Sequence, residues 1–247
     1  FNEYGVNDHA TMAWLPKECK QTHLGMKPEE IADYIKDVKD AREKYRSKIQ
    51  VKLGLEVDYY QPMMPKMKEY LHDYLTEFDY LYGSIHVLLT NGKAWGIDDE
   101  AFQNLYPKIG IDKVYIQYYS ELIDMINTGY FDVVGHMDLP KKFNQIPQNK
   151  EEIHSYALKV LDAAKKKDIA IEINTSGFRK PCKEQYPSDL IIKHIAEMEI
   201  PIVIGSDSHE PATVGLDIIR CLKLYQSYGG KTISSFNKRE RTQKTIE

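Results

Sequence analysis

Six short apolar runs, each followed by a segment with helical spacing, constrain the fold of this chain more than any other feature. The runs cover residues 4–8, 51–59, 80–88, 131–139, 169–177 and 201–207. Most of them are too apolar to have one buried and one solvent-exposed face, which indicates strands covered on both faces. Strands that alternate with helices in this way form a parallel sheet. We therefore expect an α/β fold, built as a single domain over residues 1–247.

Amphipathic segments separate the runs. In the first of them Pro28 stands where an opening helical turn tolerates proline. One apolar face then follows with helical spacing, made of Ile31, Ile35, Val38, Ala41 and Tyr45. Similar spacing recurs near residues 67–78, 114–125, 153–164, 188–198 and 213–226. The last residues, 236–247, are charged and show no apolar face, so we expect a peripheral or frayed terminus there.

Side chains that can bind a metal ion stand at the carboxyl end of every run. In an open doubly wound sheet a site gathers at one switch point, whereas in a barrel every strand contributes from its carboxyl end. The distribution therefore favours a barrel. The residues, in chain order, are Asp8, His9, Glu56, Asp58, His86, His136, Asp138, Glu172, Asn174, Asp207 and His209.

Four of the eight histidines belong to this set. A single strand-end histidine is more often a structural residue, but four of them beside Glu56 and Asp207 would bury many polar groups at high cost. Divalent metals would satisfy imidazole nitrogens and carboxylate oxygens together, and zinc, manganese and iron all accept such ligands. Six ligands exceed those of one tetrahedral zinc ion, so we expect two or three ions, with Glu56 as the best candidate bridge. A pair of bridged ions activates water and clamps a phosphoryl group.

Composition and charge limit the kinds of partner that this protein can bind. A formal net charge of -4 gives no general attraction to nucleic acid or to an anionic membrane. No stretch of the sequence approaches the roughly 20 apolar residues of a membrane span. The three cysteines are widely spaced and fit a reducing cytoplasm. We expect a cytoplasmic protein, and its oligomeric state stays open.

The motifs VNDHA, GLEVDY, GSIH, GHMDL, EINTSG and GSDSHEP occur in this order between about residues 4 and 220. Together they resemble the PHP (polymerase and histidinol phosphatase) family of metal-dependent phosphoesterases. The longer stretches GSIHVLLTNGKAWGID and EINTSGFRKPCKEQYPS are similar to its histidinol-phosphatase branch. The resemblance implies a distorted (β/α)7 TIM-like barrel. It also implies a small phosphomonoester substrate, with hydrolysis of L-histidinol phosphate to L-histidinol and phosphate in histidine biosynthesis.

The resemblance further implies which residues hold the ions. Glu56 would bridge two ions. His86 and His136 would complete the ligands of one ion, and Asp207 would bind the other. A third ion would take the two remaining histidines of the implied metal set, which is His9, Glu56, His86, His136, Asp207 and His209.

Other residues would serve the substrate. Arg179 follows the fifth run and, beside a metal cluster, would hold the phosphate through paired hydrogen bonds. Asn174 and Ser176 are further candidates near the reacting groups. The amine of histidinol would need an acidic partner, for which the candidates are Asp58, Asp98 and Asp138.

One departure from the family pattern leaves alternatives open. The family begins with a strand ending in His-x-His, and nothing in the printed sequence matches it. We expect that the first strand is absent from the printed sequence rather than from the protein. The alternatives are another PHP phosphoesterase that acts on nucleotides, or a catalytically inactive PHP fold with a structural or regulatory role.

Overall fold

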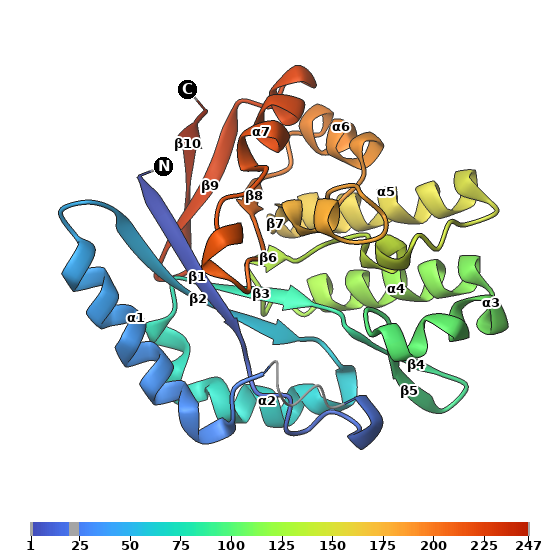
Figure 1. The fold of residues 1–247 in the computed structure, drawn as a ribbon, viewed down its shortest axis with the longest axis horizontal. Coiled ribbons are helices and arrows are strands. Elements are labelled where there is room, and N and C mark those ends of the chain that lie inside the picture. The colour runs from blue at the N-terminus through green and yellow to red at the C-terminus, as the bar shows by residue number, and fades with distance from the viewer. Residues whose placement is uncertain (1, 20–24, 247) are drawn as a thin grey trace. The chain divides into compact units, whose positions relative to one another are not determined.

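A computed structural model describes residues 2–19 and 25–246 of the chain (Figure 1). The chain divides into two compact units. The first unit consists of residues 1–95 and 236–242, and the second of residues 96–235 and 243–247. The first unit therefore takes its residues from both ends of the printed sequence.

Three parallel strands form the centre of the first unit. In the order β1-β2-β3, they are Glu3–His9, Gln50–Asp58 and Tyr80–Ser84. Helix α1 (Ile31–Tyr45) runs alongside β2, as Figure 1 shows, and helix α2 (Met64–Leu71) follows β2 in the chain. The predicted apolar face of α1 is buried over its first two turns, because Ile31, Ile35 and Val38 are almost inaccessible to solvent. The prediction was wrong for Tyr45, which lies at the end of the helix and is 40% exposed.

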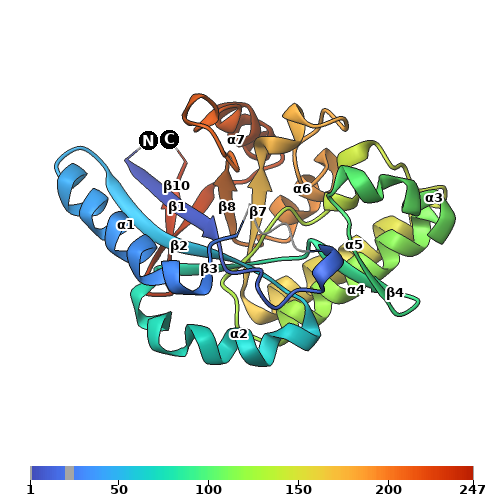
Figure 2. The ribbon, with the colours of Figure 1, turned by 60° about the horizontal axis from the view of Figure 1, so that its bottom comes forward.

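The second unit repeats the arrangement with its own three parallel strands. They are β6 (Val133–Val134), β7 (Ala170–Asn174) and β8 (Ile202–Gly205), in that order. Long helices α4 and α5 lie side by side, as Figure 2 shows. None of the helices in the described residues is long and apolar enough to cross a membrane. The helices of this unit are α3 (Tyr106–Ile109), α4 (Ile111–Asn127), α5 (Lys150–Lys167), α6 (Asp189–Glu197) and α7 (Ile218–Ser227).

All six apolar runs contain a strand, so the α/β fold is confirmed, whereas a seven-stranded barrel stays a prediction. Two details of the sequence interpretation were wrong. The run at 80–88 is not one strand, because β3 ends at Ser84 and a hairpin of β4 (Val87–Thr90) and β5 (Lys93–Gly96) follows. The charged tail is peripheral, because most of its side chains are exposed, but it is not frayed, because β9 (Thr232–Asn237) and β10 (Glu240–Thr245) pair in a hairpin. Backbone pairing needs no apolar side chains, so the sequence of the charged tail shows no hydrophobic pattern that would reveal the hairpin.

Asp79 ties the tip of this second hairpin to the first unit. Its side chain is 1% exposed and accepts hydrogen bonds from Arg42 Nη2 (2.5 Å), the amide of Leu53 (2.9 Å) and the amide of Lys238 (3.2 Å). Its carbonyl accepts a fourth bond, from the amide of Arg239 at 2.8 Å. One buried carboxylate thus joins α1, β2 and the β9–β10 turn.

We expect Asp79→Ala to lower the free energy of unfolding by about 3 kcal/mol, because it strips a buried amide and a partly buried guanidinium of their acceptor. Both tryptophans, Trp14 and Trp95, belong to the first unit, so urea unfolding followed by tryptophan fluorescence reports on it. Asp37→Ala, at an exposed carboxylate on α1, is the matched control and should leave the midpoint in place. Equal midpoints for the two variants would contradict the assigned role.

Candidate metal centre

The β1–β2 pairing places His9 and Glu56 together. The two residues are register partners at the carboxyl ends of their strands, so their side chains lie on the same face of the sheet. His9 Nε2 lies 3.9 Å from Glu56 Oε2. Both side chains are largely buried, and Glu56 as a whole is 8% exposed. A buried carboxylate in this position requires a cationic partner.

His86 approaches the other oxygen of Glu56. It follows β3 by two residues, and its Nε2 lies 3.8 Å from Glu56 Oε1. The rings of His9 and His86 meet edge to face, with centroids 5.5 Å apart. Each oxygen of Glu56 therefore faces a different imidazole, which is the disposition that a bridging carboxylate needs.

Asp58 contacts Nδ1 of His86, the ring nitrogen that does not face Glu56. It lies two residues after Glu56 on β2, so both side chains are on one face, and its Oδ1 is 2.6 Å from His86 Nδ1. Asp58 is 3% exposed. This contact favours the tautomer with hydrogen on Nδ1 and leaves the Nε2 lone pair toward Glu56.

The donor set of the first unit fits a divalent metal. Potential ligand atoms of His9, Asp58 and His86 all lie within 4.8 Å of one another. Glu56 lies next to this group, 3.9 Å from His9 and 3.8 Å from His86. We call these two imidazoles and two carboxylates the first-unit cluster: His9, Glu56, Asp58 and His86. Nitrogen and oxygen donors of this kind suit zinc, manganese or iron.

In the second unit Asp207 is held by two neighbours that the sequence singled out. Its Oδ2 accepts hydrogen bonds from Ser176 Oγ at 2.9 Å and from Asn174 Nδ2 at 3.2 Å. The same amide group also donates to Glu172 Oε2 at 3.0 Å. Asn174 and Ser176 are 1% and 3% exposed. These contacts hold the Asp207 carboxylate in place.

His136 and Asp207 have unusual backbones. Their φ angles are 21° and 44°, a region that non-glycine residues adopt rarely and at a cost. The amide of His136 donates to Glu172 Oε2 at 3.0 Å, so this buried carboxylate supports both turns. His209 lies further out, with a side chain 60% exposed and Nδ1 3.6 Å from Asp207 Oδ1.

Arg179 is fixed against the turn that carries Asp207. Its Nη2 donates to the carbonyls of Ser206 (2.6 Å) and Asp207 (3.2 Å). Its Nη1 is buried and has no hydrogen-bond partner among the described residues. A buried donor without a partner costs about 1–3 kcal/mol, and an anionic ligand would recover that cost.

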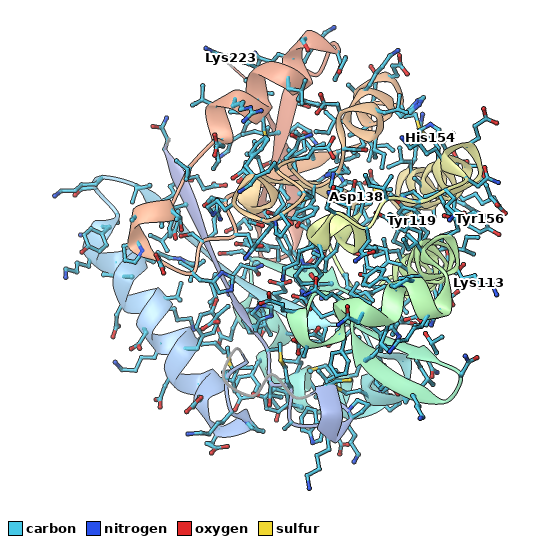
Figure 3. The ribbon with its side chains drawn as sticks, turned by 45° about the vertical axis from the view of Figure 1, so that its right-hand side comes forward. Lys113, Tyr119, Asp138, His154, Tyr156 and Lys223 are labelled. Carbon is cyan, nitrogen blue, oxygen red and sulfur yellow. The ribbon has the colours of Figure 1, made fainter. Side chains whose placement is uncertain are left out.

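The three carboxylates considered for the substrate amine already have protein partners. Asp58 contacts His86, and Asp98 lies 3.1 Å from Lys142 Nζ. Asp138, labelled in Figure 3, lies 2.9 Å from Lys141 Nζ and accepts from the amide of Ser188. Complete burial raises the pKa of Asp138 although Lys141 opposes the shift.

The sequence therefore predicted which residues belong to the site, but not which of them hold the others in position. His9, Glu56 and His86 meet in the first unit, whereas Asn174, Ser176, Arg179 and Asp207 meet in the second. It missed that Asp58 supports His86, although the two-residue spacing from Glu56 signals a shared face. It also missed that Glu172 supports Asn174 and the His136 turn.

Comparison with known proteins identifies relatives of this chain. The family model of the PHP domain matches residues 1–176. The "Probable histidinol-phosphatase" of Deinococcus radiodurans is 34% identical over 211 residues, which cover 85% of this chain and 76% of the relative. The histidinol-phosphatase of Bacillus subtilis is 30% identical over 192 residues, covering 74% and 72%.

Solved structures agree with this fold. A crystal structure from Listeria monocytogenes, named as a candidate histidinol phosphatase, superposes with a TM-score of 0.80 at 28% identity and covers 87% of both chains. The histidinol phosphate phosphatase of Lactococcus lactis, solved with zinc, L-histidinol and phosphate, gives a TM-score of 0.76 at 17% identity. That match covers 98% of this chain and 87% of the other.

We expect Asp58→Asn to weaken zinc binding about 10- to 100-fold, because the amide no longer enforces the metal-binding tautomer of His86. Competition with a chromogenic chelator at neutral pH measures the change. The control is Asp73→Asn, an exposed carboxylate in the same unit. If both folded variants bind zinc like the parent protein, Asp58 does not position His86.

Proposed function

Since this chain belongs to the PHP domain family, we propose that it is a histidinol-phosphatase, which hydrolyses L-histidinol phosphate to L-histidinol and inorganic phosphate. The first-unit cluster is the observation that carries the proposal for metal-dependent chemistry. The substrate follows from relatives that are 34% and 30% identical over most of their length and are both named for this activity. Histidine biosynthesis is the pathway in which this reaction belongs.

We propose that two or three divalent ions bind, with zinc, manganese and iron as the candidates. His9, Glu56 and His86 are the ligands of the first unit, and the second unit contributes His136, Asp207 and His209. Bound ions of this kind polarise the phosphoryl group and supply an activated water. The Lactococcus lactis phosphatase, which shares this fold, was solved with zinc.

The chain's own residues bind and orient the groups around that chemistry. Arg179 binds the phosphate and neutralises the charge that develops on its oxygens, a role supported by its buried, unpartnered Nη1 group. Asn174 and Ser176 keep the Asp207 carboxylate in one orientation. Asp58 does the same for His86.

The finer architecture is also a proposal. We infer a distorted (β/α)7 barrel that forms one functional domain over residues 1–247. The parallel strands of each unit and the TM-scores of the solved relatives support it. A cytoplasmic location suits a biosynthetic phosphatase with a small soluble substrate.

We expect phosphate release from L-histidinol phosphate to exceed release from nucleoside monophosphates by at least about 100-fold in kcat/KM, which corresponds to recognition of the histidinol part. Phosphate release by the metal-loaded protein measures both. Treatment with a chelator should abolish the activity, and zinc or manganese should restore it. A preference for nucleotides would assign another PHP phosphoesterase activity. Absence of any phosphatase activity in metal-loaded protein would favour the inactive fold.

We expect Arg179→Ala to lower kcat/KM for L-histidinol phosphate about 10²- to 10³-fold, because one donor to the developing charge is lost. Arg179→Lys should recover only part of the loss, since an ammonium lacks the planar fork of the guanidinium. Lys180→Ala removes the neighbouring cation of the same loop and serves as the control. Activity of Arg179→Ala within twofold of the parent protein would exclude the assigned role.

A further inference from the structure

Two histidines that the proposed function does not use meet on the surface of the second unit. His154 lies on α5 and His194 on α6, and Figure 3 shows His154 at the outer side of α5 next to α6. Their Nε2 atoms are 3.2 Å apart. We call these two residues the histidine pair. They stand on helices, whereas the proposed catalytic ligands stand at or just beyond strand ends.

The geometry of the histidine pair matches two ligands of one tetrahedral ion. Metal–nitrogen bonds of about 2.0–2.1 Å at a tetrahedral angle separate two nitrogens by about 3.3 Å and two imidazole centroids by about 5.2 Å. The observed separations are 3.2 Å and 5.1 Å. Two imidazoles that point head-on at each other across 3.2 Å would instead place their centroids about 5.5 Å apart. The rings therefore meet at an angle rather than head-on, as two ligands of one ion do.

A carboxylate supports this arrangement from behind. Glu197 lies one helical turn after His194, and its Oε2 is 3.3 Å from His194 Nδ1. Metal-binding histidines commonly donate their second ring nitrogen to such a carboxylate, which directs the Nε2 lone pair at the metal. Burial and then the neighbouring His194 ring lower the pKa of His154, which favours the neutral imidazole. The side chain of His194 is 28% exposed, so a hydrated ion can reach it.

We propose that the histidine pair is a second metal site, which binds one divalent transition ion of the imidazole-preferring class, such as nickel, zinc or copper. His154 and His194 supply two ligands, water fills the remaining positions, and Glu197 orients His194. A bound ion joins α5 to α6 and stabilises this helix pair. The site is independent of the proposed phosphatase activity.

Calorimetric titration with nickel tests the proposal, on zinc-loaded holoenzyme from which loosely bound zinc has been removed by gel filtration. The parent protein should bind one more nickel ion than His154→Gln, His194→Gln or the double variant. His72→Gln, at an exposed histidine of the first unit, is the matched control and should keep the extra ion. Glutamine preserves the size and polarity of these partly exposed positions, and unchanged circular dichroism and phosphatase activity confirm that each variant is folded.

Hydrogen exchange provides the second measurement. Nickel should slow amide exchange in Lys150–Lys167 and Asp189–Glu197 at least several-fold in the parent protein and in His72→Gln, but not in the double variant. Glu197→Gln should weaken binding of the extra ion about 10-fold or more, because His194 loses its carboxylate partner. Equal nickel stoichiometry and exchange in the parent protein and the double variant would overturn the proposal and leave only a hydrogen-bonded histidine pair.

Discussion

The parallel register between β1 and β2 determines the chemistry of the first unit. It sets His9 opposite Glu56, and the two-residue period of β2 then adds Asp58 to the same face. A slip of one residue would turn Glu56 and Asp58 toward the opposite face and separate both from the imidazoles. The apolar residues that alternate with these polar ones, Leu55 and Val57, are fully buried and hold the strand in this register.

The second unit depends on a chain of carboxylate contacts rather than on register. Glu172 accepts from the amide of His136 and from Asn174, and Asn174 in turn bonds Asp207. These bonds connect the ends of three strands through one buried amide side chain. Such a network fixes the turns after the strands, where His136 and Asp207 adopt strained backbone angles.

The sequence predicted the strands and helices well because each depends on local periodicity. All six apolar runs hold strands, and α1 buries Ile31, Ile35 and Val38, the first three residues chosen from its 3.6-residue spacing. The candidate ligands could be named for the same reason, since strand ends in a parallel sheet point to one edge. The contacts that support these ligands from neighbouring residues could not be predicted. Asp58 became a support for His86 only through a contact between residues 28 positions apart.

The C-terminal hairpin was missed for a related reason. Its pairing uses backbone groups, and its attachment to Asp79 joins residues 159 positions apart in the chain. No window of sequence contains both partners, and a charged strand without an apolar face resembles a disordered tail.

The same attachment has a consequence for synthesis of the protein on the ribosome. The carboxylate of Asp79 is translated early, but two of the amides that bond this residue belong to Lys238 and Arg239. The first unit therefore cannot reach its final hydrogen bonding until almost the whole printed sequence has left the exit tunnel. The second unit has most of its strands and helices between residues 96 and 235, but it also includes residues 243–247, where the amide of Ile246 donates to the carbonyl of Lys231. Both units therefore wait for the C-terminal hairpin before their last hydrogen bonds can form.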